Sequence, residues 1–116
     1  MKMYSVGYTE KFLKKVDAWS KIKFPNDNAD ALILRRKQVI HFCDSHEQFP
    51  SRMTFHSTMS ENVEIRVGIY PYAKGKYSKI FLGAVVDSDN CQVVFVSLSY
   101  KRGGLPQAGC DALTEA

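Results

Sequence analysis

Lys79-Ile80-Phe81-Leu82-Gly83-Ala84-Val85-Val86 and Val93-Val94-Phe95-Val96-Ser97-Leu98-Ser99-Tyr100 are the two stretches that decide the fold. Both are rich in β-branched and aromatic residues, and Asp87-Ser88-Asp89-Asn90 between them is a cluster of turn formers. Two such runs joined by a polar turn are typical of a β-hairpin. Each run is too short for a typical globular helix, so we expect this hairpin to be the centre of the fold.

The composition is that of one ordinary globular domain, with 116 residues, 45% hydrophobic and 24% charged. No apolar run approaches the ~20 residues of a membrane span, and the N-terminus lacks a signal-peptide pattern. Cys43, Cys91 and Cys110 are odd in number and widely spaced. We therefore expect no zinc site, no disulfide framework, no cofactor and a cytoplasmic location. The net charge of +4 fits an anionic partner.

A short strand at residues 4–8 is expected to lead into a helix over residues 10–22. Thr9 fits the N-cap of this helix, because its hydroxyl can accept from a backbone N–H of the first turn. Phe12, Val16 and Trp19 are spaced i, i+4 and i+7, so they share one face. We expect this face, including Trp19, to lie in the core.

A second helix is expected over residues 29–46, because Pro25 ends the first helix and Asn26 or Asp27 can cap the next one. The two histidines of this segment are five residues apart and form no HExxH pattern. They do not share a helix edge, so the sequence predicts no metal site here.

The segment 63–70 alternates cleanly between apolar and other residues and predicts a strand. Residues 51–62 before it have no clean period and predict a loop or an irregular edge strand. We expect the helices to cover the more apolar face of strand 63–70, leaving the other face open to solvent. The covered set is Val63, Ile65, Val67 and Ile69, and the open set is Glu64, Arg66 and Tyr70.

The element order β-α-α-β-β-β predicts an α+β two-layer domain over residues 1–102. Two N-terminal helices are expected to pack on one face of a mainly antiparallel, twisted sheet. Residues 71–76 are expected to form a basic connection. Residues 103–116 are interrupted by Gly and Pro and are expected to form a flexible C-terminal tail.

Three motifs resemble the RelE/ParE toxin superfamily, and the element order matches it. Tyr8-Thr9-Glu10-Lys11-Phe12-Leu13-Lys14-Lys15-Val16 is similar to its strand-to-helix opening, and Ile65-Arg66-Val67-Gly68-Ile69-Tyr70 to its R-V-G-x-Y strand. Val93 to Leu98, followed by Ser99-Tyr100-Lys101-Arg102, resembles its last strand with a basic ending. The resemblance implies a bacterial type II toxin with a cognate antitoxin. Such toxins are endoribonucleases, ribosome-dependent or free, or inhibitors of DNA gyrase.

Metal-independent RNA cleavage needs a base for the 2′-OH, positive charge near the phosphate and an acid for the leaving 5′-oxygen. Strand parity predicts that Arg66 and Lys101 share the open face and stabilise the phosphate. His56 or Glu64 is the candidate base, and Tyr70 the candidate stacking group or proton donor. An exposed sheet face with cross-strand ion pairs is the alternative for Arg66 and Glu64. The candidates for RNA or phosphate contacts are Arg52, Lys74, Lys76, Tyr100 and Arg102.

Three functions remain open from the sequence. The first is an mRNA endoribonuclease toxin that binds RNA, on or off the ribosome. The second is a non-catalytic inhibitor on the same fold that binds DNA gyrase or another nucleic-acid-processing complex. It is favoured by Ser99, which stands where the superfamily often has a histidine, and by the basic connection. The third is a protein unrelated to toxins that binds RNA or an acidic partner, indicated only by the basic charge.

Overall fold

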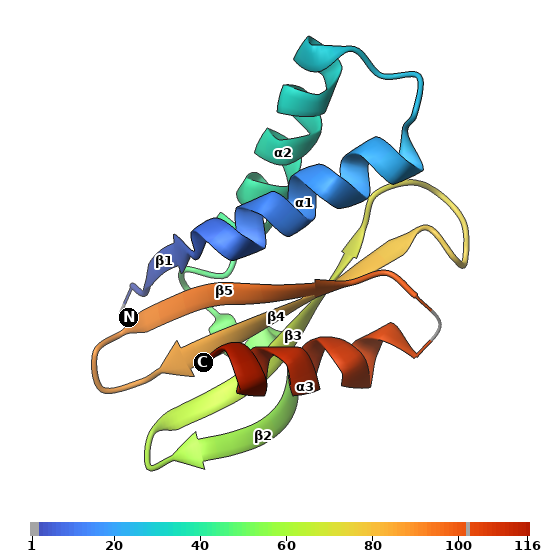
Figure 1. The fold of residues 1–116 in the computed structure, drawn as a ribbon. Helices are drawn as coiled ribbons and strands as arrows, with labels where there is room; N and C mark the ends of the chain where they lie inside the picture. Colours follow the sequence, from blue (N-terminus) through green and yellow to red (C-terminus); the bar gives the residue numbers. More distant parts are fainter. Residues whose placement is uncertain (1–2, 102) are drawn as a thin grey trace.

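A five-stranded sheet forms the middle of the computed structural model, which describes residues 3–101 and 103–116 (Figure 1). The strand order is β1-β5-β4-β3-β2. The short β1 pairs in parallel with β5, and every other pairing is antiparallel. The strands are β1 (Ser5–Tyr8), β2 (Thr54–Ser60), β3 (Val63–Pro71), β4 (Lys79–Asp87) and β5 (Gln92–Ser99).

The helices are α1 (Glu10–Lys23), α2 (Ala29–Asp44) and α3 (Gly104–Glu115), with a short 3-10 turn η1 (Pro50–Arg52). The predicted cap of α1 is confirmed, because Thr9 Oγ1 accepts from the Phe12 N–H at 3.1 Å. The predicted cap of α2 is wrong. Asn28 Oδ1 accepts from the Ala31 N–H at 2.9 Å. The Asp27 carboxylate is used elsewhere, in an ion pair with Arg35 at 2.9 Å.

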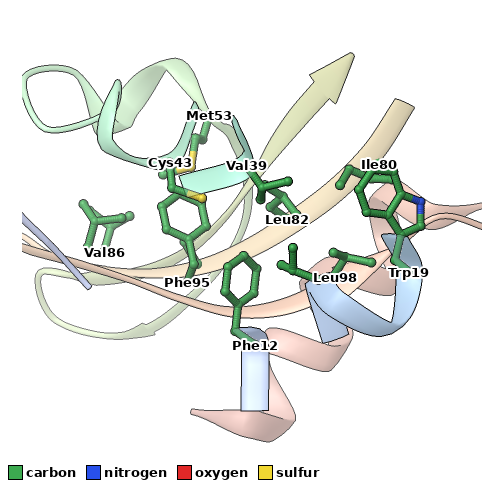
Figure 2. Packing of buried hydrophobic residues seen from close by; sticks show 13 residues of the cluster. Phe12, Trp19, Val39, Cys43, Met53, Ile80, Leu82, Val86, Phe95 and Leu98 are labelled. Atoms are coloured by element: carbon green, nitrogen blue, oxygen red, sulfur yellow. The ribbon is translucent and has the colours of Figure 1, made fainter. Parts of the chain in front are cut away.

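The main core lies between α1, α2 and one face of the sheet (Figure 2). Phe12 and Val16 of α1 are fully buried, and Trp19 is 2% exposed, which confirms its predicted place in the core. Leu82 and Phe95 meet these side chains from β4 and β5. The predicted α+β class is confirmed, as is the packing of two N-terminal helices on a mainly antiparallel sheet.

The face of β3 that meets α2 is the reverse of the predicted one. A Cβ built on Gly68 would lie 3.3 Å from the Phe42 ring of α2, and the Tyr70 ring lies 5.0 Å from the same ring, between centroids. Ile65 points the other way and packs with Ala112 of α3. The more apolar face of β3 is therefore buried by a helix that the sequence did not predict.

That helix is α3, so the predicted flexible tail is wrong. Figure 1 shows α3 lying along the sheet on the side away from α1 and α2. Gly103 has a φ of +78°, which favours glycine, and the helix begins at the next residue. Pro106 lies in the first turn, where its missing N–H breaks no helical hydrogen bond. Ala108 and Ala112, four residues apart, are both fully buried.

Residues 51–62 contain an irregular edge strand, which was one of the two structures predicted for them. Among the described residues, β2 pairs only with β3, with register shifts between Phe55 and Ser57 and between Thr58 and Ser60. Within the described residues, no helix is long and apolar enough to span a membrane.

Candidate nucleic-acid interface

The guanidinium of Arg66 is held within the fold through its Nε and Nη1 atoms. Its Nε donates to Glu64 Oε2 at 2.8 Å, and its Nη1 donates to the carbonyls of Met53 at 2.8 Å and Ser51 at 3.3 Å. The Arg66 side chain is only 18% exposed. These contacts tie β3 to the segment that leads from η1 into β2, so Arg66 and Glu64 hold each other in a structural position.

The predicted meeting of Arg66 and Lys101 on one face is wrong. Ser99 pairs with Phe81, which in turn pairs with Ile69, three residues beyond Arg66 on β3. At about 3.3 Å per strand residue, this level of the sheet is about 10 Å from Arg66. Lys101 lies beyond it, near the end of β5. Arg66 and Lys101 are therefore not brought together at one level of the sheet.

His56 is also separated from Arg66. Its ring lies against α3, because a Cβ built on Gly109 would be 2.7 Å from His56 Nε2. The same Nε2 lies 3.7 Å from Cys110 Sγ, and Nδ1 lies 3.1 Å from Ser57 Oγ. His56 thus lies on the α3 side of the sheet, while Arg66 contacts η1 on the other side. The predicted pairing of a His56 base with an Arg66 phosphate ligand is not formed.

Tyr70 lines a separate shallow hollow between α2 and β3, of about 570 Å³. Lys37 and His41 of α2 lie at its rim, and the Phe42 ring packs on Tyr70. Burial raises the pKa of the Tyr70 phenol, and the Arg35 charge acts in the opposite direction to a smaller degree. Tyr70 therefore keeps its proton at neutral pH, as the predicted donor role requires, but it lies apart from His56.

The surface best suited to contact a nucleic acid is a hollow of about 730 Å³ at the end of the sheet, here called the basic cleft. It lies between the β3–β4 connection, the end of β5 and the start of α3. Among the described residues, its lining holds three lysines and no carboxylate. Tyr77 is 85% exposed and Tyr100 is 41% exposed. The lining is Lys76, Tyr77, Lys79, Phe81, Tyr100, Lys101, Gly103, Gly104, Leu105 and Pro106.

Two glycines give the basic cleft its shape. Gly75 turns the β3–β4 connection with a φ of +122°, and its carbonyl accepts from the Ser78 N–H at 3.3 Å. Gly104 starts α3 directly over the Phe81 ring, where a Cβ would come within 2.5 Å of Cδ2. Only a residue without a side chain lets the helix start this close to β4. Tyr77 and Lys79 are thereby held opposite the end of β5.

A second hollow borders the basic cleft and shares Tyr100, Lys101 and Gly103 with it. Its far side is formed by α3, where Gln107 Nε2 donates to Asp111 Oδ1 at 2.7 Å. Tyr100 and Lys101 thus form a ridge with lysines on one side and a carboxylate on the other. The Asp111 carboxylate lines the second hollow together with Tyr100 and Lys101.

Sequence reasoning found part of this site. Lys76, Tyr100 and Lys101 were candidates, and all three line the basic cleft. Lys74 is exposed in the same connection. Arg52 lies elsewhere, with its guanidinium over the Phe49 ring at 4.7 Å.

Other parts of the site were missed or cannot be placed. The candidate Arg102 lies outside the described residues. Tyr77 and Lys79 were missed, although the density of lysines around the basic connection pointed to them. Asp111 was missed because its segment was expected to be a tail. Within residues 3–101 and 103–116, no three His, Cys, Asp or Glu side chains lie close enough to hold a metal ion.

No protein-family model, curated protein or solved structure matches this chain.

Proposed function

We propose that this chain binds single-stranded RNA in the basic cleft. The observation that carries the proposal is the grouping of Lys76, Lys79 and Lys101 with the exposed rings of Tyr77 and Tyr100. Lysines neutralise phosphates, and exposed aromatic rings stack on unpaired bases. A double helix hides its base faces, so this combination favours a single strand.

We propose further that the bound RNA is cleaved, as the resemblance to RelE/ParE toxins implies. The Asp111 carboxylate accepts the proton of a 2′-OH, and the 2′-oxygen attacks the adjacent phosphorus. Lys101 stabilises the negative charge that develops on the phosphate, and the Tyr100 hydroxyl protonates the leaving 5′-oxygen. The products are a 2′,3′-cyclic phosphate and a 5′-hydroxyl. In the cell, this activity is that of a type II toxin directed at mRNA and neutralised by an antitoxin.

A specific observation favours a second candidate, an inhibitor that binds without cleaving. The residues expected to form one catalytic group lie at three separate places: Arg66 beside η1, His56 against α3 and Tyr70 beside α2. A surface that only grips a nucleic-acid-processing complex, such as DNA gyrase, needs the basic cleft but no catalytic group. The two candidates therefore share the binding site, and only the first adds a chemical step after binding.

Binding is tested by fluorescence anisotropy with a labelled single-stranded RNA between about 50 and 200 mM salt. For single strands, log K falls against log salt with a slope of about −0.7 per phosphate contact. We expect Lys79→Ala and Lys101→Ala each to reduce this slope by about 0.7, because each removes one contact. Tyr77→Ala should weaken binding by about 1–3 kcal/mol at every salt concentration with the slope unchanged. Lys37→Ala, which removes the same charge from α2, is the matched control.

Equal effects of Lys37→Ala and Lys79→Ala on the slope would place binding outside the basic cleft.

Cleavage is tested separately, with the same RNA and with a copy in which every 2′-OH is replaced by hydrogen. We expect products only from the unmodified RNA, with chelator present, and loss of products in Asp111→Asn with binding retained. Undiminished cleavage by Asp111→Asn would overturn the assignment of the base. Tight binding without any cleavage would favour the second candidate.

A further inference from the structure

Cys110 and His56 form a thiol–imidazole pair on the surface of the α3 face. Cys110 is exposed on α3, and its Sγ lies 3.7 Å from His56 Nε2, within reach of an S–H···N hydrogen bond. The two residues are 54 positions apart and are brought together only by the packing of α3 against β2. A nucleophile beside a base that a third group orients is the arrangement that activates cysteines.

The imidazole is held in the orientation that this role requires. Gly109 leaves just enough room for the ring to lie against the α3 backbone. On the far side of the ring, Nδ1 lies 3.1 Å from Ser57 Oγ. In the tautomer whose Nδ1–H donates to the Ser57 hydroxyl oxygen, the lone pair of Nε2 points toward Cys110 Sγ.

The other two cysteines of the chain lack this environment. Cys43 is fully buried in the main core, and burial raises the pKa of its thiol. Cys91 is partly exposed in the β4–β5 turn, where its Sγ lies 3.7 Å from the Ser88 carbonyl oxygen. A carbonyl cannot take the thiol proton. Cys43 and Cys91 can therefore serve as internal references for the reactivity of Cys110. Cys43 is buried, and Cys91 lies beside a carbonyl oxygen and not beside a base.

We propose that Cys110 is a modification site that forms mixed disulfides with small-molecule disulfides, with His56 as the proton acceptor. His56 Nε2 takes the Cys110 proton, and the thiolate attacks one sulfur of the small disulfide. The S–S bond of that disulfide breaks, and its electron pair leaves with the departing sulfur, which takes a proton. The Cys110 sulfur is oxidised as the departing sulfur is reduced. Neither Cys110 nor His56 lines the basic cleft, so this proposal does not rest on RNA binding there.

The test incubates the full chain with glutathione disulfide at neutral pH, quenches with acid and measures the adduct on each cysteine by peptide mass spectrometry. We expect Cys110 to react about tenfold faster than Cys91, and Cys43 to remain unmodified. In His56→Asn, which keeps a polar side chain but removes the base, the Cys110 rate should fall to that of Cys91. Ser57→Ala should lower the Cys110 rate by a smaller factor.

The comparison of Cys110 with Cys91 needs no variant, so it stands even if a change at His56 disturbs the fold. Modification of Cys43 reports such a disturbance directly, because this thiol is accessible only in an opened chain. Equal rates at Cys110 and Cys91 in the unaltered chain would overturn the proposal. It would also be overturned if His56→Asn, with Cys43 still protected, left the Cys110 rate unchanged.

Discussion

Arg66 joins β3 to the segment that leads from η1 into β2, because its guanidinium reaches the Met53 and Ser51 carbonyls as well as the Glu64 carboxylate of its own strand. Hydrogen bonds to a charged group contribute about 1.5–3 kcal/mol each. These bonds are partly exposed to water, and contributions within one network do not add, so we expect Arg66→Ala to lower the free energy of unfolding by about 2 kcal/mol in total, measured by urea denaturation. The matched control is Lys14→Ala, which removes an equally charged but exposed side chain, 3.7 Å from Glu10. The control should change stability by less than about 0.5 kcal/mol.

An Arg66→Ala variant as stable as Lys14→Ala would show that these contacts contribute little. Arg66 would then be available for the phosphate role that its place in the sequence suggested. The strand and the alternation around Arg66 were predictable from the sequence. Its partners were not, because Ser51 and Met53 lie in a segment without any periodic pattern.

His46 gives the fold a dependence on pH. Burial, and to a smaller degree the charge of Arg52, lower the pKa of His46 below its usual 6.5, although the carbonyls of Cys43 and Phe42 act in the opposite direction. The unfolded chain therefore binds more protons than the folded chain once the pH falls below about 6.5. We expect the free energy of unfolding to decrease from about pH 7.5 to about pH 5.5, as the pH falls toward the folded-state pKa.

The measurement is urea denaturation across this range, with His46→Gln as the comparison. The variant side chain does not titrate, so its stability should vary less with pH. Asp87 and Glu115 have lowered pKa values from hydrogen bonds, to Asn90 and Lys11 respectively, but they titrate at lower pH and do not interfere. The same decrease in both proteins would exclude His46 as its source.

At the scale of elements, the sequence predicts a helix or strand correctly where its apolar residues keep one spacing along the whole element. The α1 stripe and the alternation in β3 have clear periods, and both elements formed as predicted. The sequence does not predict α3, because glycine and proline at 103–106 are typical of an irregular tail. Its buried face consists of small residues, Gly104, Ala108, Gly109 and Ala112, which give a weak apolar signal. Because the sequence does not predict α3, it places the more apolar face of β3 against α1 and α2. In the structure α3 covers this face.

The contact between α3 and the sheet depends on Gly83. A Cβ at this position would lie 2.5 Å from the Ala108 carbonyl oxygen and 2.8 Å from Ala112 Cβ, and would also clash with Ser97 Oγ. The Ser97 hydroxyl donates to the same Ala108 oxygen at 2.7 Å. Because the obstacle is partly backbone, α3 itself must move to accommodate a methyl group. We expect Gly83→Ala to lower the free energy of unfolding by about 1–3 kcal/mol.

The matched control is Gly7→Ala in β1, where the nearest side-chain atom, on Val94, is 4.0 Å from an added Cβ. It should leave stability unchanged or slightly improved, because alanine restricts the unfolded chain. Urea denaturation compares the two variants under the same conditions. Equal stability of Gly83→Ala and Gly7→Ala would contradict the close packing of α3 on β4.

At the scale of the whole molecule, the two ends of the chain complete the same sheet. β1 adds a parallel strand to β5, and α3 covers the face that α1 and α2 leave open (Figure 1). The segment after β5 thus supplies one wall of the basic cleft, the Asp111 carboxylate and the Cys110 thiol. The β-hairpin of β4 and β5 remains the centre of the fold, but each of its faces is covered by different helices.

This arrangement predicts that a chain ending at Lys101 does not keep the fold. Removal of α3 exposes Ile65 and Val96, which are 0% and 4% exposed in the complete chain. Burial of a large aliphatic side chain contributes about 1.5–3 kcal/mol, so losing this cover costs roughly 5 kcal/mol. That cost is comparable to the whole stability of a small domain. We expect the shortened chain to aggregate or to lose its cooperative thermal transition, measured by size-exclusion chromatography and circular dichroism.

Leu113→Ala, on the exposed side of α3, is the control and should melt at the same temperature as the unaltered chain. A shortened chain that melts at the temperature of the complete one would mean that residues 103–116 add nothing to the fold, as expected of a tail.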